Sequence, residues 1–562
     1  MISYRGRFFW LVVFLPFLYL LLILRLFQVQ ILQKDFFYQK ARKLQDTSIT
    51  ITPQRGEIVD RNGIPLAMDR ISYSVFYRPI SSLPQSEKLA KIASLLGYPE
   101  DTLSKKLTLG RFVYLRKGVD PELVQELRKY RLKGIEWKES FRRFYPSGPL
   151  AAPVLGFVGK ERKGLSGVEL FYDRYLKGEK GIIQAEKDGR RRILPSSRKT
   201  LLRPQEGYRI KLTLDEKLQY ILEEELGKIH RQTGARASVG ILLNPQNGEI
   251  LAMASYPSFD PNRFWESSPS NYKNRAISMV YEPGSTFKVI TMASALEEGV
   301  TSPEKEFFCE NGRFTLYNRT IHDHEPYGWL SVRAILWHSS NIGITKIAMK
   351  LGEKKLYTYI RKFGFGEKTG IDLPGEEKGI LRPYSKWSKV SIASIPYGQE
   401  IGVTPLQLAM GIAAVINGGY LLKPYVVKEI ERSGESKLRR KKEVVRRVIS
   451  ARTSKIMREI MVGVVEKGTG RKARISGYRI GGKTGTSQKY VPGKGYNSGK
   501  YTASFIGFLP ASNPELLLLI VVDEPKVGHY GGEIAAPCFK KVIERTLCYW
   551  TPQLQGRIMA KK

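Results

Sequence analysis

The sequence is poor in cysteine, histidine and acidic residues. Its 562 residues include three cysteines, five histidines and 53 acidic residues, against 92 basic residues. Three cysteines without a C-x-x-C pair exclude a disulfide scaffold and give no support to a zinc or thioredoxin-type site. The deficit of acidic residues leaves a formal charge of +39, which indicates an anionic partner such as nucleic acid, a membrane surface or an acidic polymer.

Composition also excludes an intrinsically disordered chain. Hydrophobic residues make up 42% of the chain and charged residues 26%, which is typical of folded proteins and not of disordered ones. At about 150 residues per domain, the length predicts three or four folding units. The sequence leaves open whether any two of Cys309, Cys538 and Cys548 form a disulfide.

Only one long apolar run predicts a membrane span. The 17 residues Phe8–Leu24 carry no charge and would form a helix about 25 Å long, against a bilayer core of about 30 Å. Arg25 can extend toward the headgroups, so we predict a span over 8–27 with a cytoplasmic tail at 1–7. The alternative, a cleaved signal peptide, lacks the small residues of a cleavage site. The chain is therefore predicted to cross the inner (cytoplasmic) membrane once, with its bulk on the periplasmic side.

The remaining chain divides at about residue 205. Residues 28–205 are basic and punctuated by glycine and proline, which predicts a β-rich accessory domain with a hairpin turn at Asn62-Gly63. Residues 206–549 are predicted to form one large α/β unit, followed by a basic tail at 550–562. Its predicted elements are a helix over 216–232 capped by Asp215, strands over 238–243, 249–255, 503–508 and 515–522, and a last helix over 535–549.

A serine and a lysine at the start of an apolar helix form the first chemical motif. Ser285 and Lys288 stand three residues apart, on one helix face. The helix N-terminus can stabilise an alkoxide, and a lysine desolvated by apolar walls can lose its proton and act as a base. Alone, the pair is also compatible with a simple helix cap. Two other S-x-x-K strings, at 196–199 and 302–305, lie in charged, solvated contexts and are rejected.

Two later motifs favour the catalytic interpretation. Ser339-Ser340-Asn341 follows Ser285 by 54 residues, and Lys483-Thr484-Gly485 lies on a predicted strand with small residues around it. A second K-T-G at 368–370 lies in a glycine-rich loop and is rejected. The ordered set S-x-x-K, S-x-N and K-T-G is the signature of active-serine penicillin-recognising enzymes.

With these motifs, the chain resembles the class B penicillin-binding proteins, the monofunctional peptidoglycan D,D-transpeptidases. The resemblance implies an α/β, multi-domain fold with a single N-terminal transmembrane helix and an elongated β-rich pedestal. It also implies a transpeptidase domain with a central antiparallel sheet flanked by helices, and an all-α subdomain. The further strings that carry the resemblance are Arg55-Gly56, Asp60-Arg61-Asn62-Gly63, Gly167-Val168-Glu169, Asn244-Pro245, Gly248-Glu249, Thr404-Pro405-Leu406-Gln407 and Gly468-Thr469-Gly470.

The resemblance also implies a role for each motif residue. Ser285 would attack the carbonyl between the two terminal D-alanines of a stem peptide, and Lys288 would take its proton. Ser339 would relay the proton to the leaving D-Ala, with Lys483 holding Ser339. Asn341 would hold both Lys288 and the substrate amide. The residues that would bind the substrate are Thr484, Gly485 and Thr486. The backbone N–H groups of Ser285 and Thr486 would form the oxyanion hole.

Biological context follows by resemblance as well. The string Tyr281–Lys288 and the S-S-N motif are similar to the septal, cell-division type, with the elongation type as the alternative. Expected partners are stem peptides ending in D-Ala-D-Ala, β-lactams, a polytopic septal glycosyltransferase and other division proteins. No nucleic acid, cofactor or metal is expected, although His322 and His324 lie close together in the sequence. A β-lactamase, a bifunctional enzyme and a non-catalytic sensor or scaffold are the other candidates.

Overall fold

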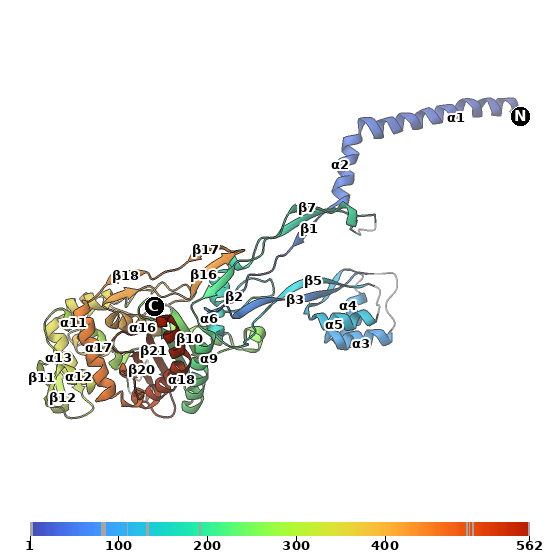
Figure 1. Cartoon of the computed structure of the whole chain (residues 1–562). Helices are drawn as coiled ribbons and strands as arrows, with labels where there is room; N and C mark the ends of the chain where they lie inside the picture. The colour runs from blue at the N-terminus through green and yellow to red at the C-terminus, as the bar shows by residue number, and fades with distance from the viewer. Residues whose placement is uncertain are drawn as a thin grey trace. The chain divides into compact units, whose positions relative to one another are not determined.

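The chain folds into two compact units. The computed structural model describes residues 4–79, 86–108, 111–130, 134–189, 193–317, 319–490, 493, 495–496 and 499–559. The first unit comprises Met1–Gln54 and Gly178–Gly207, and the second comprises Arg55–Lys177 and Tyr208–Lys562. The segment predicted as one accessory domain over 28–205 is thus shared by both units (Figure 1).

The first unit contains the apolar helix and a small sheet. Helix α1 (Tyr4–Phe27) continues through a π-helical turn (Gln28–Leu32), and α2 (Lys34–Gln45) follows. Within the described residues, Phe8–Leu32 is the one helical stretch long and apolar enough to cross a bilayer. This stretch includes the span predicted over 8–27. The unit ends in an antiparallel sheet of β1 (Asp46–Ile51), β6 (Gly181–Glu186) and β7 (Lys199–Leu202).

The second unit is built around an antiparallel five-stranded sheet in the order β10-β9-β21-β20-β19. The strands are β9 (Ala237–Leu243), β10 (Ile250–Tyr256), β19 (Gly481–Gln488), β20 (Tyr501–Leu509) and β21 (Leu516–Asp523). The strands are buried along almost their whole length because helices cover both faces of the sheet. The central antiparallel sheet predicted from the sequence is confirmed.

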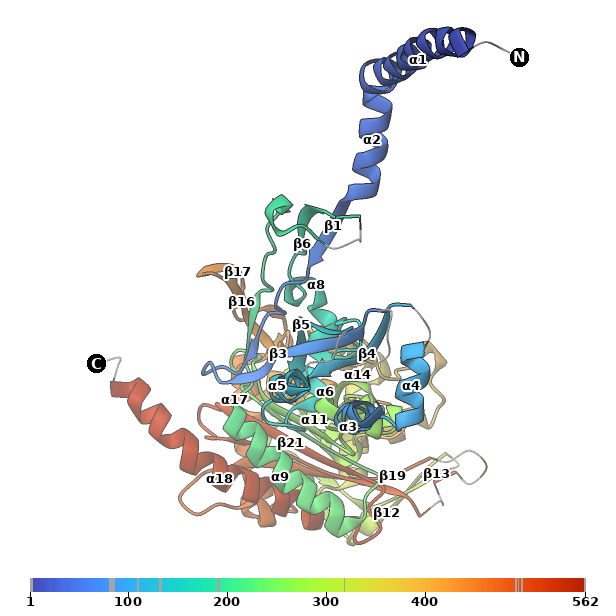
Figure 2. The same ribbon diagram turned by 90° about the vertical axis from the view of Figure 1, so that its right-hand side faces the viewer.

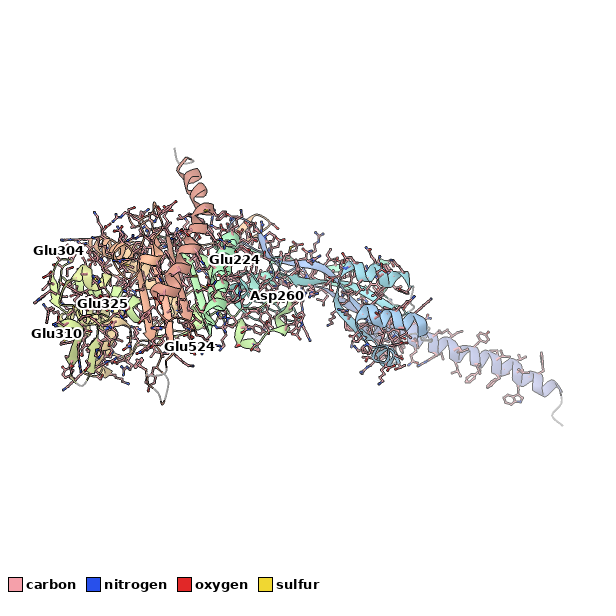
Figure 3. All side chains as sticks on the ribbon, turned by 90° about the horizontal axis from the view of Figure 1, so that it is seen from below. Glu224, Asp260, Glu304, Glu310, Glu325 and Glu524 are labelled. Carbon is pink, nitrogen blue, oxygen red and sulfur yellow. The ribbon has the colours of Figure 1, made fainter. Side chains whose placement is uncertain are left out.

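One face of this sheet packs against two helices, α9 (Glu216–Thr233) and α18 (Gly531–Met559), which lie side by side (Figure 2). Asp215 caps α9 by accepting from two backbone N–H groups of its first turn, as predicted. Glu224 on α9 accepts a hydrogen bond from Arg545 on α18 at 2.8 Å (Figure 3). Helix α18 extends beyond the predicted range 535–549 because Trp550 still packs into the core beneath it.

Helices cover the opposite face and form the predicted all-α subdomain. Helix α11 (Lys288–Glu297) is its central member and is buried almost all round. Around it lie α13 (Asn341–Leu351), α14 (Glu353–Lys362), α16 (Pro405–Ile416) and α17 (Ala451–Glu466), with α12 (Val332–Trp337) packed on α17. A helix enclosed in this way fixes its first residue firmly in space, which matters because Lys288 is that residue.

A second sheet joins the segment 55–177 to the rest of this unit. Its strand order is β17-β16-β8-β2-β3-β4, with β5 paired to β3. The strands are β2 (Ile58–Val59), β3 (Pro65–Tyr77), β4 (Val113–Val119), β5 (Ile135–Phe144), β8 (Arg209–Leu212), β16 (Val427–Arg432) and β17 (Glu435–Arg439). The hairpin predicted at Asn62-Gly63 connects β2 to β3, and Gly63 has the positive φ of 93° that such a turn requires.

Three helices that the sequence did not predict cover one face of β3, β4 and β5. They are α3 (Ser86–Leu96), α4 (Glu100–Thr108) and α5 (Pro121–Lys129). Each is short, with nine to eleven residues, and its apolar positions, such as Leu103 and Leu107 on α4, belong to the core against this sheet. The remaining short elements are α6 (Ala152–Leu155), α7 (Gly167–Phe171), α8 (Asp173–Leu176), α10 (Arg275–Ser278), β11 (Glu306–Phe308), β12 (Arg313–Leu316), β13 (Arg319–His322), β14 (Trp329–Ser331), α15 (Ser391–Ser394), β15 (Tyr420–Leu422) and β18 (Val444–Arg447).

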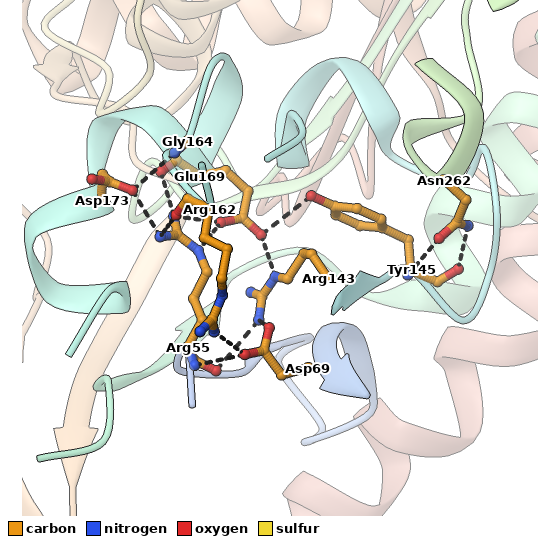
Figure 4. A network of polar contacts seen from close by, with 9 residues as sticks. All are labelled: Arg55, Asp69, Arg143, Tyr145, Arg162, Gly164, Glu169, Asp173 and Asn262. Atoms are coloured by element: carbon orange, nitrogen blue, oxygen red, sulfur yellow. Dashed lines mark hydrogen bonds and ion pairs between the residues drawn. The ribbon is translucent and has the colours of Figure 1, made fainter. Parts of the chain in front are cut away.

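A buried ionic network holds the segment 55–177 together (Figure 4). Its centre is Glu169, which is fully buried and accepts from Arg55 Nε at 2.7 Å and Arg143 Nε at 2.6 Å. Arg55 NH1 also donates to Asp173, and Arg143 pairs with Asp69. Each buried charge thus faces an opposite charge, which offsets the cost of removing it from water. The strings Arg55-Gly56 and Gly167-Val168-Glu169, noted in the sequence, meet in this network.

Candidate active site

Ser285 and Lys288 lie where a 3₁₀ turn enters the buried helix α11. The turn covers Gly284–Phe287, so Ser285 lies just before the α-helix. The sequence pattern had instead placed Ser285 at the N-terminus of the helix itself. Ser285 is half-buried, whereas Lys288 is fully buried. Among the described residues, no side chain donates to or accepts from the Ser285 hydroxyl, which leaves it available to a ligand.

The S-S-N motif connects α12 to α13, as expected from the two helical patterns that flank it. Ser339 adopts a positive φ of 61°, a left-handed conformation that costs a non-glycine residue about 1–2 kcal/mol. Ser340 is the N-cap of α13, and its hydroxyl accepts from Gly343 N at 2.9 Å. Lys288 Nζ donates to the Ser339 carbonyl oxygen and, at 3.1 Å, to Ser339 Oγ.

Lys483 reaches the same serine from the sheet. It lies on β19, the edge strand, and is fully buried. Its Nζ donates to Ser339 Oγ at 2.9 Å and to the Thr484 carbonyl oxygen at 3.1 Å. The Ser339 hydroxyl therefore lies between two lysine amines that are far apart in the sequence.

Burial changes the acid–base properties of both lysines. Desolvation lowers the pKa of Lys288 to about 7, and the negative charge of Asp323 opposes this shift. Burial also lowers the pKa of Lys483 well below its ordinary value, and the positive charge of Lys288 lowers it further. A neutral lysine amine has a lone pair and can accept a proton at physiological pH.

Small residues allow the serine segment to approach β19 closely. A Cβ at Gly485 would lie 2.3 Å from Ser504 Oγ and 2.9 Å from Thr286 Cγ2. A Cβ at Gly284 would lie 2.9 Å from the Thr486 carbonyl oxygen, and Gly284 has a positive φ of 57°. The turn that carries Ser285 thus packs directly against the strand that carries Lys483.

The two threonines of the third motif already have protein partners. Thr484 Oγ1 and Thr469 Oγ1 lie 2.7 Å apart, so one hydroxyl donates to the other. Thr486 Oγ1 accepts from Gly531 N at 3.1 Å, at the start of α18. Because β19 is an edge strand, half of its backbone N–H and C=O groups point away from β20 and can pair with an extended peptide.

Asn341 forms no hydrogen bond to Lys288 or Lys483 among the described residues. Its Nδ2 donates to the His322 carbonyl oxygen at 2.8 Å. The structure therefore brings together Lys288, Ser339 and Lys483, with Ser285 on the adjoining turn, and does not form the contact expected between Asn341 and Lys288.

Asp323 is the site residue that sequence reasoning missed. Its carboxylate accepts from Ser340 Oγ at 2.5 Å, from Asn341 N at 2.5 Å and from Ile342 N at 3.1 Å. These bonds fasten the S-S-N motif to the loop after β13. The string Ile321-His322-Asp323-His324-Glu325 drew attention only as a metal candidate. Nothing in its local pattern indicates a contact 17 to 19 residues further along the chain.

The described residues include no group of three or more His, Cys, Asp and Glu side chains arranged to hold a metal ion. All three cysteines are free thiols: Cys309 and Cys538 are buried, and Cys548 is exposed. No pair of them forms a disulfide in the structure.

Comparison with known proteins identifies the family. Residues 239–544 match the penicillin-binding protein transpeptidase domain, and residues 50–212 match the penicillin-binding protein dimerisation domain. The chain is 35% identical over 561 residues to stage V sporulation protein D of Bacillus subtilis, covering 97% of this chain and 86% of the relative. It is 31% identical over 502 residues to the peptidoglycan D,D-transpeptidase FtsI of Escherichia coli, covering 88% and 83%.

A solved structure agrees with these matches. Penicillin-binding protein 3 of Mycobacterium tuberculosis in complex with aztreonam superposes with a TM-score of 0.70 at 26% identity, covering 90% of this chain and 97% of that one. The chain belongs to the class B penicillin-binding proteins. It is a serine-type D-Ala-D-Ala transpeptidase of peptidoglycan, and its family binds stem peptides and β-lactams.

Proposed function

We propose that Ser285 is the nucleophile of this transpeptidase. Its Oγ attacks the carbonyl between the two terminal D-alanines, the bond to the last D-Ala breaks, and an acyl-enzyme ester forms on Ser285. An amine of a neighbouring stem peptide then attacks the ester and forms the crosslink. The observation that supports this role most directly is the pair of buried lysines that donate to Ser339 Oγ, because one of them, Lys288, stands three residues after Ser285.

Lys288 is the proposed base for the attack. It lies one helical turn after Ser285, and its pKa of about 7 leaves a large fraction of the amine neutral at physiological pH. The Ser285 proton passes to Lys288 Nζ as the new C–O bond forms. General-base catalysis of this kind typically accelerates a reaction by about 10²- to 10⁴-fold.

Ser339 and Lys483 complete the proposed proton path. Lys288 Nζ and Lys483 Nζ lie 3.1 Å and 2.9 Å from Ser339 Oγ, so a proton on Lys288 can move through this hydroxyl to the nitrogen of the departing D-Ala. Lys483 holds the hydroxyl in place and adds positive potential. The left-handed backbone of Ser339 is consistent with a residue that the surrounding structure forces into position.

The edge strand β19 is the proposed substrate platform. The stem peptide adds beside it as a further strand, with Thr484, Gly485 and Thr486 around its terminal carboxylate. The backbone N–H groups of Ser285 and Thr486 form the oxyanion hole, where each donor is typically worth about 3–4 kcal/mol in the transition state. Asn341, at the N-terminus of α13, contacts the substrate amide.

The chain is also proposed to be anchored in the inner membrane and to act at the septum. Residues 8–27 span the bilayer, residues 1–7 stay in the cytoplasm, and residues 28–205 and 206–549 form pedestal and catalytic domains on the periplasmic side, followed by the tail 550–562. The Phe8–Leu32 helix supports the span, and the similarity to FtsI supports a septal role. The partner proposed on the resemblance alone is a polytopic septal glycosyltransferase. The sporulation relative favours a second candidate, peptidoglycan synthesis during sporulation.

Two experiments test this proposal. First, the purified chain is incubated with fluorescent penicillin, and the stability of the adduct is followed. A transpeptidase hydrolyses its penicilloyl ester slowly, so the adduct should persist, whereas rapid release of the penicilloyl group would indicate a β-lactamase. Second, cells are depleted of the protein. Filaments are expected from a septal enzyme, and round cells would instead assign it to elongation.

A further inference from the structure

Helix α2 has an apolar face that the described residues of its own unit leave exposed. None of its twelve residues is buried, and Phe36 and Leu44 are 61% and 78% exposed. At about 100° per residue, Phe36, Leu44, Phe37 and Ala41 fall within one arc of the helix, which also contains Lys40, and Gln39 lies on the opposite side. A helix with one apolar face and little buried surface is expected to rest against an apolar surface outside its own fold.

The helix changes direction where the predicted span ends. The π-helical turn Gln28–Leu32 closes the apolar helix, and Gln33, with φ −108° and ψ 15°, leaves helical geometry before α2 begins. A π-helical turn is a recognised cause of a sharp kink. Figures 1 and 2 show α2 turning sharply across the axis of α1. If α1 crosses a bilayer, a helix in this direction runs along its surface.

The charged residues of α2 suit a phospholipid headgroup layer. The helix carries four basic residues against the single acidic residue Asp35. Lys40 Nζ lies 5.8 Å from the centre of the Phe36 ring, and the Arg42 guanidinium lies 4.8 Å from the centre of the Tyr38 ring. The aliphatic parts of such long side chains can lie along apolar groups while their charged ends reach water or headgroups. Aromatic rings and basic groups together are typical of the lipid–water interface.

We propose that α2 lies flat in the lipid–water interface, with Phe36, Phe37 and Leu44 toward the acyl chains and its basic side chains on headgroup phosphates. The proposal rests on the proposed membrane span but not on the acyl-transfer chemistry. Its consequence concerns the first strand, because β1 begins at Asp46, directly after α2. The sheet of the first unit therefore starts at the bilayer surface, and the chain leaves the membrane at a fixed height.

The occupant is a lipid surface because the apolar face continues directly from the span. Leu32 ends the stretch that is long enough to cross the bilayer, and Phe36 follows after only three residues, so the face lies at the membrane boundary for any span that ends at Leu32. If a second copy of the chain or another membrane protein covered this face instead, the labels at 37 and 44 in the test below would be shielded from both oxygen and the nickel chelate.

Site-directed spin labelling of the full-length chain in lipid nanodiscs tests the proposal. The background variant is Cys548→Ser, because Cys548 is the exposed cysteine and the other two are buried. Labels are placed at Phe37→Cys and Leu44→Cys on the apolar face and at Gln39→Cys on the opposite face. Their accessibility to dissolved oxygen and to a water-soluble nickel chelate is then measured in nanodiscs with and without anionic lipid.

Labels at 37 and 44 are expected about 5–10 Å below the headgroups, and the label at 39 is expected in water. Replacing Lys40 and Lys43 by glutamate should move the label at 37 toward water, and the shift should be larger with anionic lipid. Equal access of the nickel chelate to positions 37 and 39 would overturn the proposal. A label at Leu18→Cys separates the two failures, since it must lie deep in the bilayer if the span is correct, whatever α2 does.

Discussion

Removing the carboxylate of Asp323 is predicted to slow acylation of the enzyme, although Asp323 lies on a different loop from every motif residue. The carboxylate accepts three hydrogen bonds from Ser340, Asn341 and Ile342. Those bonds hold the backbone that follows Ser339, whose left-handed conformation needs support from its surroundings. In Asp323→Ala, the support is lost and Ser339 Oγ moves away from the two lysine amines.

The size of the effect follows from the bonds that are lost. A hydrogen bond to a charged group contributes about 1.5–3 kcal/mol. If the equivalent of one such bond is lost from the transition state, acylation slows by about 10- to 150-fold at about 1.4 kcal/mol per tenfold. Asp323→Asn keeps an acceptor oxygen for the backbone N–H groups, so its loss in rate is predicted to be smaller.

The asparagine variant gives a second, independent readout. The Asp323 charge raises the pKa of Lys288 against the larger effect of burial. Without this charge, the pKa of Lys288 falls below about 7, and the amine stays neutral to lower pH. The acid limb of the pH–rate profile for acylation must therefore shift to lower pH in Asp323→Asn. A residue with only a structural role would lower the rate without moving this limb.

The assay is the second-order rate of acylation by a chromogenic or fluorescent β-lactam between pH 5 and pH 9, with folding checked by circular dichroism. Glu325→Gln is the matched control, because it removes one negative charge from the same loop at an exposed position (Figure 3). A wild-type rate and an unshifted acid limb in both Asp323 variants would refute the reasoning. An equal shift of the acid limb in the Glu325→Gln control would also refute it.

Three further predictions concern the base, the buried network and the close approach of β19. In the wild-type enzyme the acylation rate should fall as the pH drops below about 7, because Lys288 becomes protonated, and a rate independent of pH would contradict its role as base. Glu169→Gln should cost about 3–5 kcal/mol in the free energy of unfolding, measured with urea, because two buried arginines lose their shared counter-charge; a change below about 1 kcal/mol would contradict this. Gly485→Ala should sharply reduce β-lactam acylation and lower the free energy of unfolding by less, because the added Cβ would lie 2.9 Å from Thr286 Cγ2 and push β19 from the Ser285 turn; normal acylation would show that the strand has room.

Much of the fold was predictable where local pattern and tertiary structure agree. The apolar runs at 238–243 and 515–522 are strands because they are buried on both faces, and Asp215 starts α9 because it is a strong N-cap. Helices α3, α4 and α5 were not predicted, although Leu89, Ile92 and Leu96 of α3 recur at helical spacing. The end of α18 was missed because the packing of Trp550 is a tertiary contact.

The site shows the same division. The sequence motifs alone identify Lys288, Ser339 and Lys483, because each of these residues has a fixed position within a short motif. Asp323 has no such spacing, since it reaches the S-S-N motif by folding of the chain between β13 and α13. The hydrogen bond of Asn341 to His322 was equally invisible, because it depends on the same loop.

The most direct test of the account is the location of the acyl group after reaction with a β-lactam. The purified chain is treated with benzylpenicillin, digested and analysed by mass spectrometry, alongside Ser285→Ala and the matched control Ser196→Ala, whose serine belongs to the rejected S-x-x-K string. We expect one penicilloyl group on the peptide that contains Ser285, in the wild type and in Ser196→Ala, and none in Ser285→Ala. An adduct on any other residue, or one that persists in Ser285→Ala, would contradict it.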